Sequence, residues 1–81
     1  MNIRLKKQPQ KYLAAVNEST RIKLLQGIDD IKELRGDIKK LRGTASLYRY
    51  KINHYRIIFE WENGQDIIII ETINTRTNIK Y

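Results

Sequence analysis

The fold of this chain is decided by the stretch LYRYKINHYRIIFEW, residues 47–61. Two runs within it, residues 47–52 and 55–61, are rich in tyrosine and in β-branched or aromatic side chains. Such runs are typical of strands, and the Asn53-His54 pair between them suits a tight turn. We therefore predict two antiparallel strands joined in a hairpin.

Alternation along these strands assigns their side chains to two faces. One face collects aromatic and branched aliphatic side chains and is expected to pack against helices. Arg49, Lys51 and Arg56 then share the opposite face, because that arrangement avoids burying charge. Like charges close together destabilise a sheet, and a fold tolerates them more readily where an anion binds. An ordinary solvated sheet face, on which lysine and arginine are common, is the alternative interpretation.

The segments before this stretch have the pattern of a short strand and two helices. Residues 2–6 alternate apolar and polar side chains, which indicates a first strand. Pro9 suits the first turn of a helix, and Ser19 is suited to cap a second one. In that second helix the apolar residues recur mainly at intervals of three, and Gly36 is suited to end it.

The segment after the central stretch predicts one further strand, at residues 67–73. Asn63-Gly64 is a strong hairpin signal, because both residue types tolerate positive φ. The run Ile67–Ile70 does not alternate, so this strand is expected to be central and covered on both faces. The sequence therefore predicts an α+β fold in the order β-α-α-β-β-β, with a helix hairpin packed on one face of a twisted, mostly antiparallel four-stranded sheet.

The composition restricts the class of protein. The chain has 81 residues, no cysteine and one histidine, so we expect a single domain spanning residues 1–81, without a disulfide, a metal site or a cofactor. The longest apolar run, Ile67–Ile70, has four residues, and a membrane span needs about 20. The first residues lack the apolar core of a signal peptide. A cytoplasmic protein without a membrane segment is therefore expected.

Charge gives the first indication of function. The chain carries 16 Lys and Arg residues against 9 Asp and Glu residues, a formal net charge of +7. The excess is clustered, because residues 39–59 contain six basic residues and no acidic one. A clustered positive field favours a polyanionic partner through release of counterions from phosphates, whereas a basic surface kept for solubility is the alternative. The six basic residues are Lys39, Lys40, Arg42, Arg49, Lys51 and Arg56.

Three motifs resemble the central signature of RelE-type toxins, a branch of the RelE/ParE superfamily. The string Lys40-Leu41-Arg42-Gly43 leads into the basic strand at residues 47–52, and the next strand opens with Tyr55-Arg56. The tail, residues 73–81, is similar to the family's final strand and its arginine-containing end. The resemblance extends over the whole chain, and the predicted order of elements agrees with that of the family.

The resemblance implies a toxin of a type II toxin–antitoxin system. In the RelE branch, such a toxin is a ribosome-dependent endoribonuclease, an mRNA interferase. It cuts mRNA in the ribosomal A site by transfer of the phosphodiester to the ribose 2′-hydroxyl, and so inhibits translation. This chemistry needs a base, an acid and positive charge around the phosphorane, and it requires no metal. The implied partners are the ribosome with its mRNA, and an acidic antitoxin that neutralises the toxin in a hetero-oligomer.

The resemblance also implies roles for individual residues. Lys51 matches the family's candidate basic catalyst, and Arg56 and Arg76 match the arginines that stabilise phosphate charge. Tyr81 resembles the C-terminal aromatic that stacks on a base or assists proton transfer. Arg49 falls where the RelE branch often has lysine, and we interpret it as a phosphate clamp, because arginine does not readily lose a proton. Further RNA contacts are expected from Lys39, Lys40, Arg42, Lys80 and His54.

Other hypotheses stay open. Histidine is a residue type that often transfers protons in enzymes, and for His54 a plain turn residue is the alternative to RNA contact or proton transfer. A ParE-like inhibitor of DNA gyrase, without nuclease activity, would use the same fold as a binding module. A catalytically degenerate toxin that persists as a binding protein is a further hypothesis, favoured by the arginine at position 49.

Overall fold

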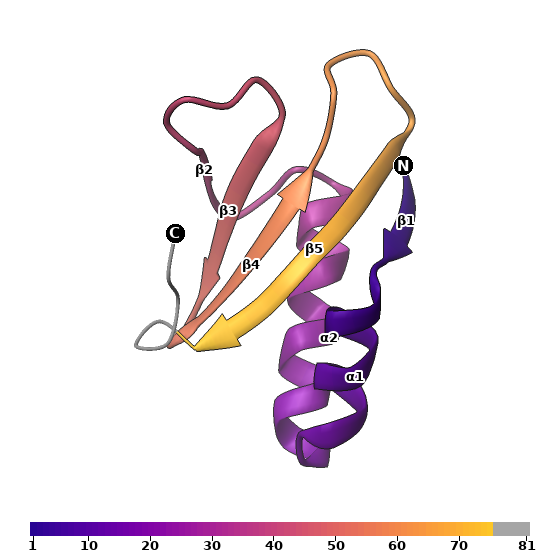
Figure 1. Cartoon of the computed structure of the whole chain (residues 1–81). Coiled ribbons are helices and arrows are strands. Elements are labelled where there is room, and N and C mark those ends of the chain that lie inside the picture. Colours follow the sequence, from indigo (N-terminus) through magenta and orange to yellow (C-terminus); the bar gives the residue numbers. More distant parts are fainter. Residues whose placement is uncertain (76–81) are drawn as a thin grey trace.

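The fold is a sheet with a pair of helices on one of its faces (Figure 1). A computed structural model describes residues 1–75. The elements in chain order are β1 (Asn2–Leu5), α1 (Lys7–Ala15), α2 (Glu18–Lys32), β2 (Asp37–Lys40), β3 (Leu47–Ile52), β4 (Tyr55–Glu60) and β5 (Ile67–Thr75). The strand order across the sheet is β1-β5-β4-β3-β2. Within these residues β1 and β5 pair in parallel, and every other neighbouring pair is antiparallel.

The sheet has five strands, whereas the sequence predicted four. The predicted α+β class, the helix hairpin on one face and the mostly antiparallel pairing are confirmed. The predicted strand number was wrong because Asp37–Lys40 forms an additional edge strand that pairs with β3. This strand has four residues, and Ile38 is the one apolar residue among them, so its alternating pattern is too short to predict a strand.

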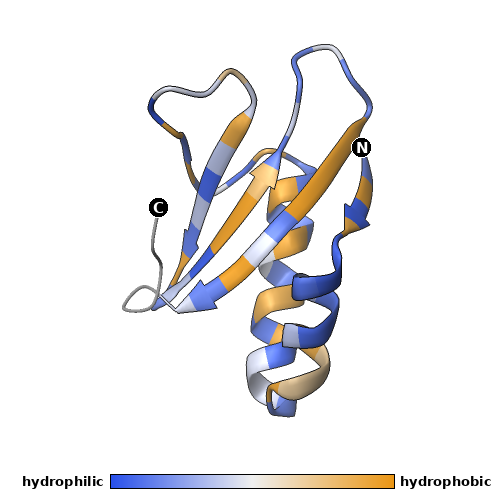
Figure 2. Ribbon diagram, viewed as in Figure 1, coloured by the Kyte–Doolittle hydropathy of each residue, from blue (hydrophilic) through white to orange (hydrophobic). Residues whose placement is uncertain are grey.

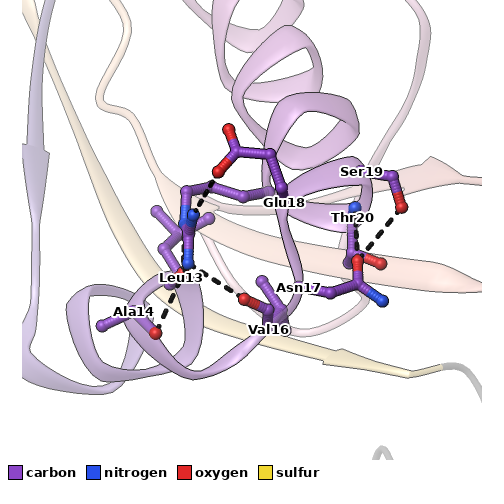
Figure 3. A network of polar contacts seen from close by, with 8 residues as sticks. Leu13, Ala14, Val16, Asn17, Glu18, Ser19 and Thr20 are labelled. Carbon is purple, nitrogen blue, oxygen red and sulfur yellow. Dashed lines mark hydrogen bonds and ion pairs between the residues drawn. The ribbon is translucent and has the colours of Figure 1, made fainter.

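The two helices are joined by the short connection at residues 16–17. Asn17 caps α2, because its side-chain oxygen Oδ1 accepts a hydrogen bond from the backbone N–H of Thr20 at 2.9 Å (Figure 3). The predicted cap, Ser19, instead donates its hydroxyl to the same oxygen at 3.1 Å. The helix therefore begins slightly earlier than the sequence indicated.

Arg21 ties the end of α1 to the start of α2. Its guanidinium donates to the main-chain carbonyls of Leu13 and Val16, at 2.8 and 2.9 Å, and it also pairs with Glu18 at 3.0 Å. Figure 3 shows how these groups converge at the turn between the helices. The carbonyls at the carboxyl end of a helix lack intrahelical partners, and a cation there both satisfies them and complements the helix dipole.

The core lies between the helices and the sheet. Figure 2 shows hydrophobic segments along β4 and β5. In β5 the side chains of Ile68 and Ile70 are fully buried, while Ile67 and Ile69 on the other face are only half-buried. The expected burial of both faces of this strand was therefore wrong, because α1 and α2 cover a single face. The buried hydrophobic residues are Leu13, Leu24, Ile28, Ile31, Tyr50, Ile57, Phe59, Ile68, Ile70 and Ile73.

A β-bulge at Glu71 determines which residues of β5 face the core. The β4–β5 register shifts by one residue between Ile58 and Phe59, and Glu71 is the extra residue. Uninterrupted alternation after Ile70 would turn Ile73 outward. The extra residue instead brings Ile73 back into the core, where it is fully buried.

Candidate nucleic-acid interface

Strand register gathers four basic side chains on the sheet face away from the helices. Lys51 lies opposite Arg56, and Lys39 lies opposite Arg49. Tyr50 points into the core and is 3% exposed, so its neighbours Arg49 and Lys51 point outward. The prediction that Arg49, Lys51 and Arg56 share one face is confirmed. We name the surface formed by Lys39, Arg49, Lys51 and Arg56 the cationic face.

Arg49 is nearly buried although it belongs to this face. Its side chain is 11% exposed, and its Nη1 makes no hydrogen bond with any residue from 1 to 75. Nη1 lies 3.7 Å from Oδ2 of Asp37, which is close enough for an ion pair but too long for a hydrogen bond. A buried donor without an acceptor costs about 1–3 kcal/mol. The cationic face therefore contains a donor that an incoming anion would satisfy.

Asp37 is a carboxylate at the edge of the cationic face, and sequence analysis missed it. It begins β2 and lies opposite Lys51 in the β2–β3 register. Its side chain is 55% exposed. The available signal was the alternation of polar Asp37 and Lys39 around apolar Ile38, which is too short to distinguish a strand from a loop.

Tyr50 anchors β3 to α2 from the helix side of the sheet. Its hydroxyl donates to Oδ2 of Asp30 at 2.9 Å, and burial, together with this hydrogen bond, raises the pKa of Tyr50 to about 12. Two glycines pack closely against this ring. A Cβ added to Gly27 would lie 3.0 Å from a ring carbon, and a Cβ added to Gly36 would lie 2.6 Å from another. Gly36 also has a φ of 97°, which residues with side chains rarely adopt. This packing holds β3 and the start of β2 in place, and these segments carry side chains of the cationic face on the opposite side of the sheet.

Strand β5 places polar side chains beside the cations, and these were not predicted as site residues. Asn74 lies opposite Arg56, and Thr72 lies opposite Ile58. Both Asn74 and Thr72 are half-buried. Amide and hydroxyl groups of this kind hydrogen bond to phosphate oxygens and sugars in nucleic-acid complexes.

Three other predicted RNA contacts, Lys40, Arg42 and His54, do not belong to the cationic face. Lys40 is opposite Tyr48, so it points to the helix side of the sheet. Arg42 is exposed in the connection between β2 and β3, and His54 is exposed in the β3–β4 turn, with its ring centroid 4.3 Å from that of Tyr55. Arg76, Lys80 and Tyr81 lie outside the described residues, so the expected approach of Arg76 to the other cations stays a prediction.

The cationic face is suited to bind a phosphate group and offers a side chain for proton transfer. Arg49 and Arg56 present planar, cationic sets of hydrogen-bond donors. Lys51 lies opposite Arg56 and two residues along β3 from Arg49, and an amine can exchange a proton where a guanidinium does not.

Among residues 1–75, no group of three or more His, Cys, Asp or Glu side chains is arranged to hold a metal ion. No helix in this range has the length and apolar character needed to cross a membrane.

Comparison with known proteins relates this geometry to that of solved structures. No family model matches the sequence, and no curated protein matches it significantly. The archaeal RelE–RelB complex from Pyrococcus horikoshii OT3 is similar with a TM-score of 0.75 at 26% identity, over 96% of this chain and 97% of that one. The RelB–RelE antitoxin–toxin complex from Methanococcus jannaschii is similar with a TM-score of 0.72 at 29% identity, over 91% of each chain. The intact E. coli RelBE toxin–antitoxin complex gives a TM-score of 0.75 at 17% identity over 91% of this chain and 94% of that one, a likeness of fold alone.

Proposed function

We propose that this chain, which has the fold of the RelE toxins, is the toxin of a type II toxin–antitoxin pair and an endoribonuclease that cleaves mRNA on the ribosome. The resemblance to the RelE/ParE superfamily in its sequence is confirmed by the structural neighbours from several species. Their fold supports the role of toxin, and the nuclease activity is argued from the residues of the chain itself.

One observation carries the proposal: Arg49, Lys51 and Arg56 share one sheet face, and the helices cover the other. Cations gathered in this way attract a polyanion and release the counterions condensed on its phosphates. The net charge of +7 favours the same partner. A purely structural surface has no need of a nearly buried arginine with an unused donor, which is what Arg49 provides.

In the proposed reaction the ribose 2′-oxygen attacks the adjacent phosphorus, and the bond from phosphorus to the 5′-oxygen breaks. The products are a 2′,3′-cyclic phosphate and a 5′-hydroxyl end. Lys51 is proposed to transfer a proton, while Arg49 and Arg56 stabilise the charge that develops on the phosphorane oxygens. Arg76 and Tyr81, which lie outside the described residues, are proposed from the resemblance to add a second phosphate-binding arginine and a base-stacking ring.

The proposed partners follow from the charge and from the similar complexes. The structures from P. horikoshii and M. jannaschii contain RelE together with RelB. By analogy, we propose that an acidic antitoxin covers this basic chain in a hetero-oligomer and that the free toxin acts in the cytoplasm, where ribosomes and mRNA are found.

A cell-free translation system tests the function directly. The purified chain is added during translation of a defined message, and primer extension then maps new 5′ ends. We expect discrete cuts within the translated region that require active ribosomes. Intact mRNA together with unaffected protein synthesis at micromolar chain would refute the nuclease proposal.

A parallel supercoiling assay separates the two toxin classes. Stabilised cleavage complexes of DNA gyrase, without mRNA cuts, would select the ParE-like function instead. Absence of both activities, with retained binding to an acidic antitoxin, would select a degenerate toxin that acts as a binding protein.

A further inference from the structure

Asp37 is a carboxylate at the edge of the cationic face. It lies opposite Lys51, and its Oδ2 lies 3.7 Å from Nη1 of Arg49. We propose that Asp37 stands in for a phosphate group next to Arg49 while the protein is free of RNA, and that it limits the affinity of the cationic face for anions. The inference rests on the proposed function, because it names a residue that controls binding at the same site.

The contact between Asp37 and Arg49 offsets charge without satisfying the buried donor. Nη1 of Arg49 has no hydrogen-bond partner among residues 1–75, and the 3.7 Å separation from the carboxylate is too long to supply one. A phosphate oxygen that binds a guanidinium lies at about 2.7–2.9 Å and makes a charge-assisted hydrogen bond. Arg49 therefore gains a bond when a phosphate replaces Asp37 beside it.

The two partners differ in exposure in the way that such an exchange requires. The Asp37 side chain is 55% exposed and the Arg49 side chain is 11% exposed. When an anion arrives, the carboxylate can turn into water and keep its hydration, while the guanidinium stays in place. Asp37 also begins an edge strand, which within residues 1–75 pairs only with β3, so the exchange leaves the rest of the sheet unchanged.

The position of Asp37 is fixed by the residue before it. Gly36 packs against the Tyr50 ring so closely that an added Cβ would lie 2.6 Å from a ring carbon. The Gly36 carbonyl accepts a hydrogen bond from the backbone N–H of Ile38 at 3.0 Å. The chain therefore turns tightly into β2, and this turn sets the carboxylate beside Arg49.

Removal of the carboxylate is expected to tighten anion binding. Asp37→Asn should lower the dissociation constant for inorganic pyrophosphate by about 1.5-fold to fivefold, the range that corresponds to a partly exposed ion pair. The matched control is Asp29→Asn, which removes the same charge from an exposed position on α2, the element on the other face of the sheet. A gain that depends on Arg49 should vanish when Asp37→Asn is combined with Arg49→Ala.

The experiment measures the rise of the melting temperature with pyrophosphate, in a chelator-containing buffer, for the full chain and each variant. An anion that binds the folded state raises the melting temperature by an amount that grows with the logarithm of one plus the ratio of the free anion concentration to Kd, so a titration reports affinity without any nuclease activity. Asp37→Thr is measured as a second variant, because threonine suits a strand and keeps the test valid if asparagine unfolds the chain. Binding of a 2′-O-methyl single-stranded RNA, which resists cleavage, is followed by fluorescence anisotropy on the same proteins.

The outcomes separate the inference from the function on which it rests. Tighter binding in both Asp37 variants than in Asp29→Asn, lost with Arg49→Ala, supports the inference. Equal or weaker binding in the Asp37 variants overturns it, as does absence of pyrophosphate binding by every variant. If the gain is present but the chain leaves mRNA intact during translation, the nuclease proposal fails while the role of Asp37 in anion binding stands.

Discussion

The two faces of β3 differ in how completely their polar groups are satisfied. On the helix side, Tyr50 is 3% exposed and its hydroxyl donates to Asp30. On the other side, Arg49 is 11% exposed, yet its Nη1 has no hydrogen-bond partner within residues 1–75. These residues are adjacent in the chain and similarly enclosed. The difference indicates that burial on the helix side comes with a satisfied polar group, whereas burial on the other side leaves a donor of Arg49 available.

The largest expected effect is a loss of stability when a residue on the helix side of the sheet is truncated. Phe59 is fully buried and stacks on Tyr48 with 5.4 Å between ring centroids. Phe59→Ala should lower the free energy of unfolding by about 3–5 kcal/mol, measured by urea denaturation. Ile58→Ala, at the adjacent half-buried position on the outer face, is the control and should cost less than half as much. Equal losses would mean that the two faces contribute alike to stability.

The corresponding change on the outer face should affect activity rather than stability. Arg56→Ala is expected to reduce mRNA cleavage by about 10²–10³-fold, as loss of one group that stabilises transition-state charge does elsewhere. The rate is read from primer extension in the translation system, and urea denaturation of the same protein checks the fold. Lys23→Ala removes an exposed cation from α2 and should leave cleavage unchanged. Undiminished cleavage by the Arg56 variant would remove this residue from the proposed site.

A smaller loss of stability is expected from a substitution at Gly36, where the chain turns into β2. Gly36→Ala should cost about 2–4 kcal/mol of unfolding free energy, because the new Cβ meets the Tyr50 ring and φ is 97°. Gly64→Ala has a similar φ of 89° but nothing within 4 Å of the new Cβ, so it should cost about 1–2 kcal/mol. Thermal and urea unfolding of both variants measure the difference. If the two costs are equal, the packing of Gly36 against Tyr50 contributes nothing beyond its backbone conformation.

The smallest effect concerns the hydroxyl of Tyr50. Tyr50→Phe should lower the unfolding free energy by about 0.5–1.5 kcal/mol at neutral pH, through loss of the hydrogen bond to Asp30. The pKa of Tyr50 is raised in the folded state from 10.0 to about 12, so the stability it contributes is present below pH 10 and is lost as the pH rises toward 12. The gap in unfolding free energy between wild type and variant should therefore narrow between about pH 9 and about pH 12. A gap that stays constant over this range would contradict the raised pKa of Tyr50, whose largest cause is burial.

The outer face could be predicted because charge decides which of the two alternating sets of side chains faces away from the helices. Once a strand alternates, Arg49 and Lys51 cannot lie beneath the helices without a large cost, so their face is determined by the sequence. The same argument places Arg56 beside them, as the register shows. The helix hairpin was predictable for a related reason, since its apolar residues recur at helical intervals.

The features that sequence analysis missed depend on contacts between distant segments. Strand β2 has a single apolar residue and forms because it pairs with the edge of β3, so Asp37 could not be placed in advance.

The Asn63-Gly64 pair lies in a longer connection between Glu60 and Ile67, and of the pair only Gly64 has positive φ. A hairpin connection was predicted at this pair, and the antiparallel pairing of β4 with β5 confirms it.

The bulge at Glu71 also bears on how the chain tolerates changes in length. Because the extra residue is absorbed there, its deletion would leave Ile70 facing the core, Thr72 outward and Ile73 inward, as they are now. What would be lost is the ion pair in which Lys6 Nζ lies 2.7 Å from Glu71 Oε1. Related sequences can therefore differ by one residue at this point without exchanging the two surfaces of the sheet. A one-residue gap in their alignment at β5 would mark a straightened strand and not a lost one.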